Sequence, residues 1–100
     1  MMIRFFIRMM IMSLFILGQT VITRNALHVC QHKEIDPIKL LARHGNGDWG
    51  DLCQSDKQLN KQAIGHDDRI LSKYIVNGES FYIITEWDRS YTTIMLCSDY

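Results

Sequence analysis

Apolar residues in the first half of the chain recur at the three- and four-residue spacing of helices. Over residues 24–32, Ala26, Leu27 and Cys30 fall on one side of such a helix. Thr23 precedes this segment, and its hydroxyl is a suitable N-cap because it can accept a bond from a backbone N–H of the first turn. The pattern predicts a short first helix.

A second helix is predicted to begin at Asp36 and Pro37, where the aspartate caps and the proline occupies the first helical position. Ile38 and Leu41 then face the core. Gly45 is expected to end this helix in the left-handed conformation that glycine adopts easily.

A third helix is predicted to be capped by Ser55 or Asp56 and to run to about Ile64, with Gly65 ending it. Its apolar residues are few, so it is expected on the surface with one narrow contact face. Residues 47–51, Gly-Asp-Trp-Gly-Asp, lie before it. They predict a brief helical turn that buries the tryptophan, with the two aspartates spaced like a capping box.

The last third of the chain changes to partly alternating apolar and polar residues. It predicts three strands of an antiparallel meander, over residues 69–76, 79–87 and 91–97. Asn77 and Gly78 join the first two strands, because both tolerate the positive φ of a type I′ turn. Both faces carry apolar side chains and are expected to be partly covered. Residues 14–22 can add a strand at the sheet edge.

Helices followed by strands predict an α+β fold. We expect two or three short helices packed on a three- to four-stranded antiparallel sheet with a C-terminal meander. The length of 100 residues suits a single domain, which we assign to residues 12–100.

The N-terminal segment permits three interpretations. Two arginines before the apolar run 9–17 resemble a secretory signal, but the run is shorter than the ~20 residues of a membrane span, and no Ala-x-Ala site follows. We favour an internal start at Met12, which leaves residues 1–11 as an upstream extension without a structural role. The alternatives are a signal or anchor in residues 1–18, giving an exported or inner-membrane-associated protein, and a structured N-terminal helix.

Charge is balanced at 11 basic and 11 acidic residues, but not evenly along the chain. Residues 1–30 hold three arginines and no acid, whereas residues 31–100 hold 8 basic and 11 acidic residues, a net charge of −3. Phosphate-binding surfaces are usually basic, so general nucleic-acid binding is not favoured.

The three cysteines, at positions 30, 53 and 97, are widely spaced and include no CxxC pair. An odd number at such spacing argues against a disulfide framework and against a cysteine zinc site. Free thiols are typical of a reducing compartment, so we expect a cytoplasmic protein.

His44, Asp48 and Asp51 form the first candidate site. They can offer one nitrogen and two carboxylates to a divalent metal, which is the basis of a nuclease or hydrolase hypothesis. The same residues suit a turn anchored by Trp49. We favour the turn, because each residue already has a turn or capping role.

The second candidate site is the Asp-Arg-Ser turn at residues 88–90. Arg89 at a hairpin end can hold a phosphate or carboxylate, with the hydroxyls of Ser90 and Thr92 beside it. The alternative is that these residues only shape the turn. The sequence therefore nominates six binding residues in all: Asp48, Trp49, Asp51, Asp88, Arg89 and Ser90.

Two histidine groups have less specific patterns. His28 and His32 lie four apart on a predicted helix, but a zinc site needs further ligands. Residues 66–68, His-Asp-Asp, can form half of an acid–base site with Glu86 or Asp88 across the sheet, although a solvated loop is the simpler interpretation. No metal or cofactor is predicted.

The chain resembles a family of small bacterial proteins in two blocks: Gly-Asp-Trp-Gly-Asp-Leu at 47–52 and Ile-Thr-Glu-Trp-Asp-Arg-Ser-Tyr-Thr-Thr-Ile at 84–94. Residues 17–23, 41–44 and 72–74 share the resemblance. Its members occur on plasmids, phages and integrated elements. They are usually labelled plasmid-related proteins and sometimes a type I restriction methylase subunit. The resemblance spans about residues 14–100 and implies no activity and no catalytic residue.

The methylase label has no chemical basis in these residues. An adenine methylase needs a glycine-rich cofactor loop and an Asn/Asp-Pro-Pro-aromatic loop for the flipped base. The chain has one proline, Pro37, and no such glycine loop after a strand.

The sequence thus favours a small non-enzymatic accessory protein of a mobile genetic element. It would bind a macromolecular partner, either a host protein or one encoded by the element. Aromatic side chains in the strands and at the C-terminal end would anchor such a contact if exposed: Tyr82, Trp87, Tyr91 and Tyr100.

Overall fold

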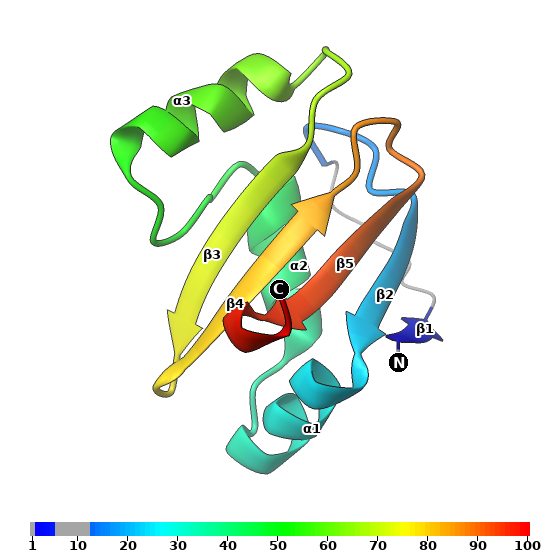
Figure 1. Ribbon diagram of the computed structural model, residues 1–100, viewed down its shortest axis with the longest axis vertical. Helices are drawn as coiled ribbons and strands as arrows, with labels where there is room; N and C mark the ends of the chain where they lie inside the picture. Colours follow the sequence, from blue (N-terminus) through cyan, green and yellow to red (C-terminus); the bar gives the residue numbers. More distant parts are fainter. Residues whose placement is uncertain (1, 6–12) are drawn as a thin grey trace.

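The computed structural model describes residues 2–5 and 13–100 and contains one mixed sheet (Figure 1). Its strands, in spatial order, are β1 (Met2–Phe5), β2 (Gln19–Thr23), β5 (Tyr91–Leu96), β4 (Glu79–Thr85) and β3 (Ile70–Val76). With three helices, this confirms the α+β class. The β3-β4-β5 meander is also confirmed, and Asn77 and Gly78 at its first turn both have positive φ.

The sheet is antiparallel except where β2 runs parallel to β5. Ile22 lies opposite Ile94 in this pair. Parallel neighbours need a long crossover, and here the connection contains every helix and two strands of the meander. The expected sheet therefore gains one parallel pairing, which no local pattern in either strand encodes.

Strand β1 corrects the interpretation of residues 1–11 as an extension without a structural role. Met2–Phe5 pairs antiparallel with β2, so that Met2 lies opposite Thr23 and Phe5 opposite Thr20. For these four residues the prediction is wrong. Residues 6–12, which hold the proposed start at Met12 and part of the apolar run, lie outside the described residues.

The three helices begin close to where their caps predict. For α1 (Arg24–Lys33), the Thr23 hydroxyl accepts a bond from Ala26 N at 3.1 Å. For α2 (Pro37–Gly45), Asp36 Oδ1 accepts one from Ile38 N at 3.0 Å. Helix α3 (Gln54–Ala63) begins at least two residues earlier than expected, because its N-cap is Cys53, which makes no side-chain cap bond, rather than Ser55 or Asp56. The first two caps are confirmed.

Gly45 does not have the left-handed conformation that we predicted. It belongs to α2, the C-cap is Asn46 at φ −92°, and Gly47 has the positive φ of 84°. Gly45 instead lies against the segment that precedes β2. Leu14 N donates to Gly45 O at 2.8 Å, and a Cβ on Gly45 would lie 2.7 Å from Ser13 Oγ.

Helices α1 and α2 lie on one face of the sheet, and α3 lies beside the outer strand β3 (Figure 1). The buried cluster between sheet and helices includes Ile22, Phe81 and Ile83 from the strands and Ala26 and Leu41 from the helices. The opposite face carries the short turn η1 (Cys97–Asp99). On that face Ile84 is buried, whereas Ile75 and Tyr91 are exposed.

Candidate functional site

Residues 47–51 form a non-helical segment that runs past strand β3, rather than a helical turn. Trp49 is 8% exposed and packs with Ala63 and Ile70. Asp48 accepts bonds from Gly50 N at 3.2 Å and from Arg43 Nε at 2.6 Å. The predicted burial of the tryptophan is confirmed, but the predicted helical turn and its capping box are wrong.

This block covers the outer edge of the sheet. Lys73 N donates to Trp49 O at 3.1 Å, and Asp51 N donates to Lys73 O at 2.7 Å. The Asp51 carboxylate also accepts a bond from Ile75 N at 3.0 Å. Gly50 is required at the crossing, because its φ is 74° and a Cβ would lie 2.0 Å from Lys73 O.

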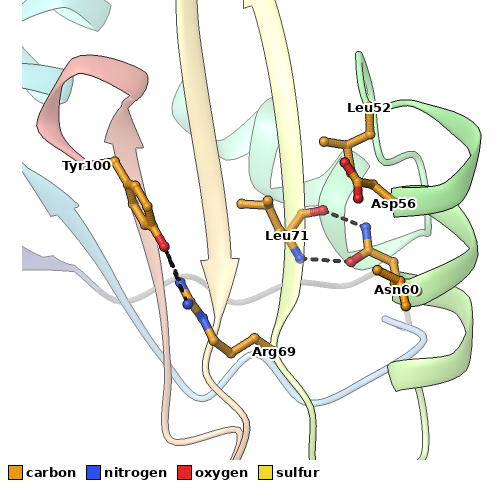
Figure 2. A pocket seen from close by; sticks show the side chains of 7 residues that line it. Leu52, Asp56, Asn60, Arg69, Leu71 and Tyr100 are labelled. Carbon is orange, nitrogen blue, oxygen red and sulfur yellow. Dashed lines mark hydrogen bonds between the residues drawn. The ribbon is translucent and has the colours of Figure 1, made fainter.

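Asn60 of α3 continues the cover along β3. Its side-chain amide donates to Leu71 O and accepts from Leu71 N, at 2.5 and 3.0 Å (Figure 2). Open strand edges attract further strands, and this one has its outward N–H groups at 71, 73 and 75 bonded to its own chain. Asp51 and Asn60 therefore have structural partners at the edge.

His44 lies in the core and belongs to a chain of hydrogen bonds. Thr92 donates its hydroxyl hydrogen to Leu17 O at 2.6 Å, so it accepts from Thr85 at 2.7 Å. Thr85 then accepts from His44 Nε2 at 2.9 Å, and His44 Nδ1 accepts from Ser72 at 2.6 Å. These partners assign the neutral Nε2–H tautomer to His44.

The surroundings of His44 keep it uncharged. It is fully buried, and the rings of Phe15 and Trp49 meet it edge-on with centroids 5.2 and 6.1 Å away. Desolvation lowers the pKa of His44 from its ordinary 6.5 to about 3. Both ring nitrogens already have hydroxyl partners, so His44 has no free position for a metal or a substrate.

The predicted metal group of His44, Asp48 and Asp51 does not assemble. The histidine is buried, whereas both aspartates are exposed and bonded to Arg43 and to backbone N–H groups. Among residues 2–5 and 13–100, no three His, Cys, Asp or Glu side chains come together as a set that could hold a metal ion. The geometry therefore contradicts the ligand set of the nuclease hypothesis.

Arg89 binds its own chain rather than presenting a free cation. Its guanidinium donates to five carbonyl oxygens, at distances from 2.5 to 3.4 Å: Ala63, His66, Asp68, Glu86 and Trp87. It thereby ties the α3–β3 loop to the β4–β5 turn. These bonds engage its terminal nitrogens and agree with the alternative interpretation, in which Arg89 shapes the turn.

The other two residues of this turn are also structural. Asp88 Oδ1 accepts a bond from Ser90 N at 3.0 Å, and bonds from Ser90 lower the pKa of Asp88. Phe15 links this turn to residues 47–51, since its ring stacks on Trp49 at 6.2 Å and lies 6.0 Å from the Arg89 guanidinium. The two sequence blocks therefore meet through packing and not through a shared polar surface.

The remaining histidine groups are exposed. The rings of His28 and His32 lie 4.4 Å apart on α1. The side chains of residues 66–68 are exposed, and the backbone carbonyls of His66 and Asp68 accept bonds from Arg89. This arrangement agrees with a structured loop that joins α3 to the sheet.

A trough between α3 and the sheet is the candidate site that sequence reasoning missed. It consists of two neighbouring pockets of about 250 and 520 Å³ that share Leu59 and Arg69. Figure 2 shows Asp56 and Asn60 on α3, with Asn60 bonded to Leu71, and Arg69 extending toward Tyr100. Gln62, Asp68 and Trp87 line the larger pocket.

Exposed apolar side chains surround this trough. Leu59 is 62% exposed, Trp87 56% and Tyr100 74%. Tyr100 meets Tyr82 edge-on, with ring centroids 5.6 Å apart. The signals in the sequence were two of the aromatic residues offered as anchors, Trp87 and Tyr100, which line the trough. The expectation of exposed aromatic anchors holds for Trp87, Tyr91 and Tyr100.

Arg69 in the wall of the trough is bound only weakly. Its Nη1 and Nη2 atoms both lie 3.5 Å from the Tyr100 hydroxyl, at the outer limit of a hydrogen bond. Within the described parts of the chain, the ion pairs are Lys33–Glu79 and Arg43–Asp48, and Arg69 belongs to neither. Its donors are therefore open to a ligand.

None of the helices in the described residues has the length and apolar composition to cross a membrane. Comparisons of the chain with protein-family models, with curated proteins and with solved structures gave no match.

Proposed function

We propose that this protein is a small non-enzymatic accessory protein of a mobile genetic element and that it binds a protein partner through the trough. The observation that carries the binding role is the exposure of Leu59, Trp87 and Tyr100 around Arg69. Binding energy at protein interfaces concentrates in aromatic and arginine side chains of this kind. The mobile-element setting depends on the family resemblance of the blocks at 47–52 and 84–94.

The state of the other polar groups supports binding over catalysis. His44 is neutral and enclosed, Arg89 is engaged by backbone carbonyls, and Asp51 holds a strand edge. A general base or nucleophile has to reach its substrate. The trough instead offers apolar walls and one cation, which suit recognition of a surface.

Site-specific photo-crosslinking in host extract tests this function, with the crosslinking group placed at Lys61 on α3. We compare the natural chain with the double variant Leu59→Gln/Trp87→Gln. The matched control is Ile16→Gln/Ile38→Gln, which also removes two exposed apolar side chains. We expect a defined adduct with the natural chain and the control and its loss from the trough variant. Adducts that are the same in all three chains would contradict the proposal.

We also propose a cytoplasmic location. The three cysteines, Cys30, Cys53 and Cys97, are free thiols in the structure, which suits a reducing compartment. Fractionation of expressing cells, with a periplasmic and a membrane marker, tests this. Recovery in the periplasmic or membrane fraction would favour the exported or membrane-associated alternative.

A further inference from the structure

We propose that the segment of the partner that fills the trough is a basic amphipathic helix, with an apolar side chain in the smaller pocket and a lysine or arginine against Trp87 and Asp68. This inference rests on the proposed function, because it assumes that the trough is a binding site. It adds the chemical class of the occupant.

Charge around the trough is the first argument. Two acidic residues line it, Asp56 and Asp68, and five more adjoin a lining residue in the chain: Asp51, Asp67, Glu86, Asp88 and Asp99. Arg69 is the one basic residue in the lining of the two pockets, and Lys57 and Lys61 adjoin the lining in the chain, so acidic residues outnumber basic ones by seven to three. Neither ion pair of the described residues involves any of these seven carboxylates. A cationic partner complements this rim, and a phosphate backbone is repelled by it.

The larger pocket provides a specific place for a cation. Trp87, Asp68 and Leu59 line it, and the indole is more than half exposed. An ammonium or guanidinium group over an indole face gains a cation–π interaction, and a neighbouring carboxylate adds a charge-assisted hydrogen bond. One lysine or arginine side chain can make both contacts here.

The smaller pocket provides the apolar anchor. Leu52, Leu59, Leu71 and Tyr100 line it. Arg69, between the pockets, can donate to a carbonyl oxygen or a carboxylate of the partner, as Arg89 does to carbonyls within the chain. A partner segment with an apolar and a basic side chain on one face can fill the smaller and the larger pocket together.

The shape of the partner follows from the strand next to the trough. Outward backbone groups of β3 are bonded to Asn60, Trp49 and Asp51, so the partner cannot dock by adding a strand there. Recognition has to use side chains in a groove, and an amphipathic helix is the usual ligand of such a groove.

Binding of designed peptides, followed by ¹⁵N–¹H NMR, tests the inference. The probes are amphipathic helical peptides of about four turns with the same leucine face and either lysines, glutamates or glutamines on the polar positions. We expect the lysine peptide to shift the amide signals of residues 59, 69 and 87, and to bind more weakly as salt is raised. Equal affinity of the glutamate peptide would overturn the inference.

Charge variants of the protein make the test local. Asp56→Asn/Asp68→Asn should weaken the lysine peptide about 5-fold at low salt, as expected for two partly exposed charge contacts. Glu34→Gln/Glu79→Gln removes the same number of charges away from the trough and should leave the affinity within about 1.5-fold. Equal losses in both variants would show a general charge effect and overturn the assignment to the trough.

These results separate the two proposals. If the crosslinked adduct depends on Leu59 and Trp87 but the lysine peptide has no advantage over the glutamine peptide, protein binding at the trough stands and the basic partner is wrong. If the adduct does not depend on these residues, the proposed function fails, whatever the peptides do.

Discussion

The two tryptophans of this protein lie in regions that use similar residues in opposite ways. Trp49 is 8% exposed in a region dense with glycine, aspartate and histidine, and every polar group that we nominated there bonds to the protein itself. Trp87 is 56% exposed beside a plain helix and a loop, and its neighbour Arg69 has only weak contacts. The dense turn residues around Trp49 thus fix a backbone path, whereas the side chains around Trp87 keep unbonded groups and form the surface that we propose binds a partner.

Two arginines repeat this contrast. Arg89 donates to five carbonyl oxygens and joins two loops, whereas Arg69 has only the two 3.5 Å contacts with Tyr100. Both residues follow an aspartate in the chain. The difference arises from tertiary contacts, so substitutions at matched positions can test it directly.

The largest effect is expected for His44→Ala, which should lower the free energy of unfolding by about 4 kcal/mol. The substitution leaves a cavity and removes the partners of two buried hydroxyls. Urea denaturation measures the change. His32→Ala, at an exposed position, is the control and should change stability by less than ~0.5 kcal/mol. A loss below ~1 kcal/mol at position 44 would contradict the structural role of the network.

Arg89→Met should lower the free energy of unfolding by about 2–3 kcal/mol, because several loop carbonyls lose their donor. Arg69→Met should change stability by less than ~0.5 kcal/mol, because the side chain is exposed. Thermal and urea unfolding of both variants measure the pair. Equal losses of unfolding free energy in the two variants would contradict the difference between Arg89, which holds two loops together, and Arg69, which has only weak contacts.

Acid should destabilise the protein through His44 by about 2 kcal/mol between pH 7 and pH 5. The folded state resists protonation of His44 down to a pKa of about 3, whereas the unfolded state takes up the proton near 6.5. The unfolded state therefore binds more protons as the pH falls through this window, and stability decreases. Urea midpoints across the range measure the effect.

The control for this pH dependence is His44→Gln, which has no titrating group at position 44. Its stability should be nearly flat over the same window, because the carboxylates titrate mostly at lower pH. If the variant and the natural chain lose stability in parallel, the pH dependence arises elsewhere and His44 is not neutral in the fold.

The smallest expected effect is a change in tryptophan fluorescence when either tryptophan is replaced. In Trp87→Phe the remaining Trp49 should emit at shorter wavelength and resist quenching by acrylamide, whereas in Trp49→Phe the remaining Trp87 should emit at longer wavelength and be quenched readily. The exposed fractions of 8% and 56% are the reason. Similar spectra and quenching in the two variants would contradict the comparison.

Local features of the fold could be read from the sequence. Thr23 and Asp36 cap their helices, and Asn77 and Gly78 form the predicted turn, because each interaction spans only a few residues. Alternation located the three strands of the meander for the same reason. The start of α3 differs from the prediction by at least two residues, because no capping side chain fixes it.

Contacts between distant parts of the chain could not be predicted from the sequence. The sequence does not indicate that Gly45 lies against Ser13, that Asp51 bonds to Ile75, or that Arg89 reaches Ala63. The trough was missed for a related reason: Leu59, Arg69 and Trp87 come from α3, the α3–β3 loop and the β4–β5 turn, and share no motif. Exposure, which singles them out, is a property of the folded chain.

The parallel pairing of β2 with β5 has a consequence for synthesis of the protein. Because the ribosome makes β2 early and β5 last among the strands, β2 lacks its inner neighbour until almost the whole chain has emerged. Non-local strand pairing of this kind is slow to form and leaves apolar segments unprotected in the meantime. Nascent chains and products cut short before Tyr91 would therefore be substrates for chaperones and proteases, so that only complete copies accumulate.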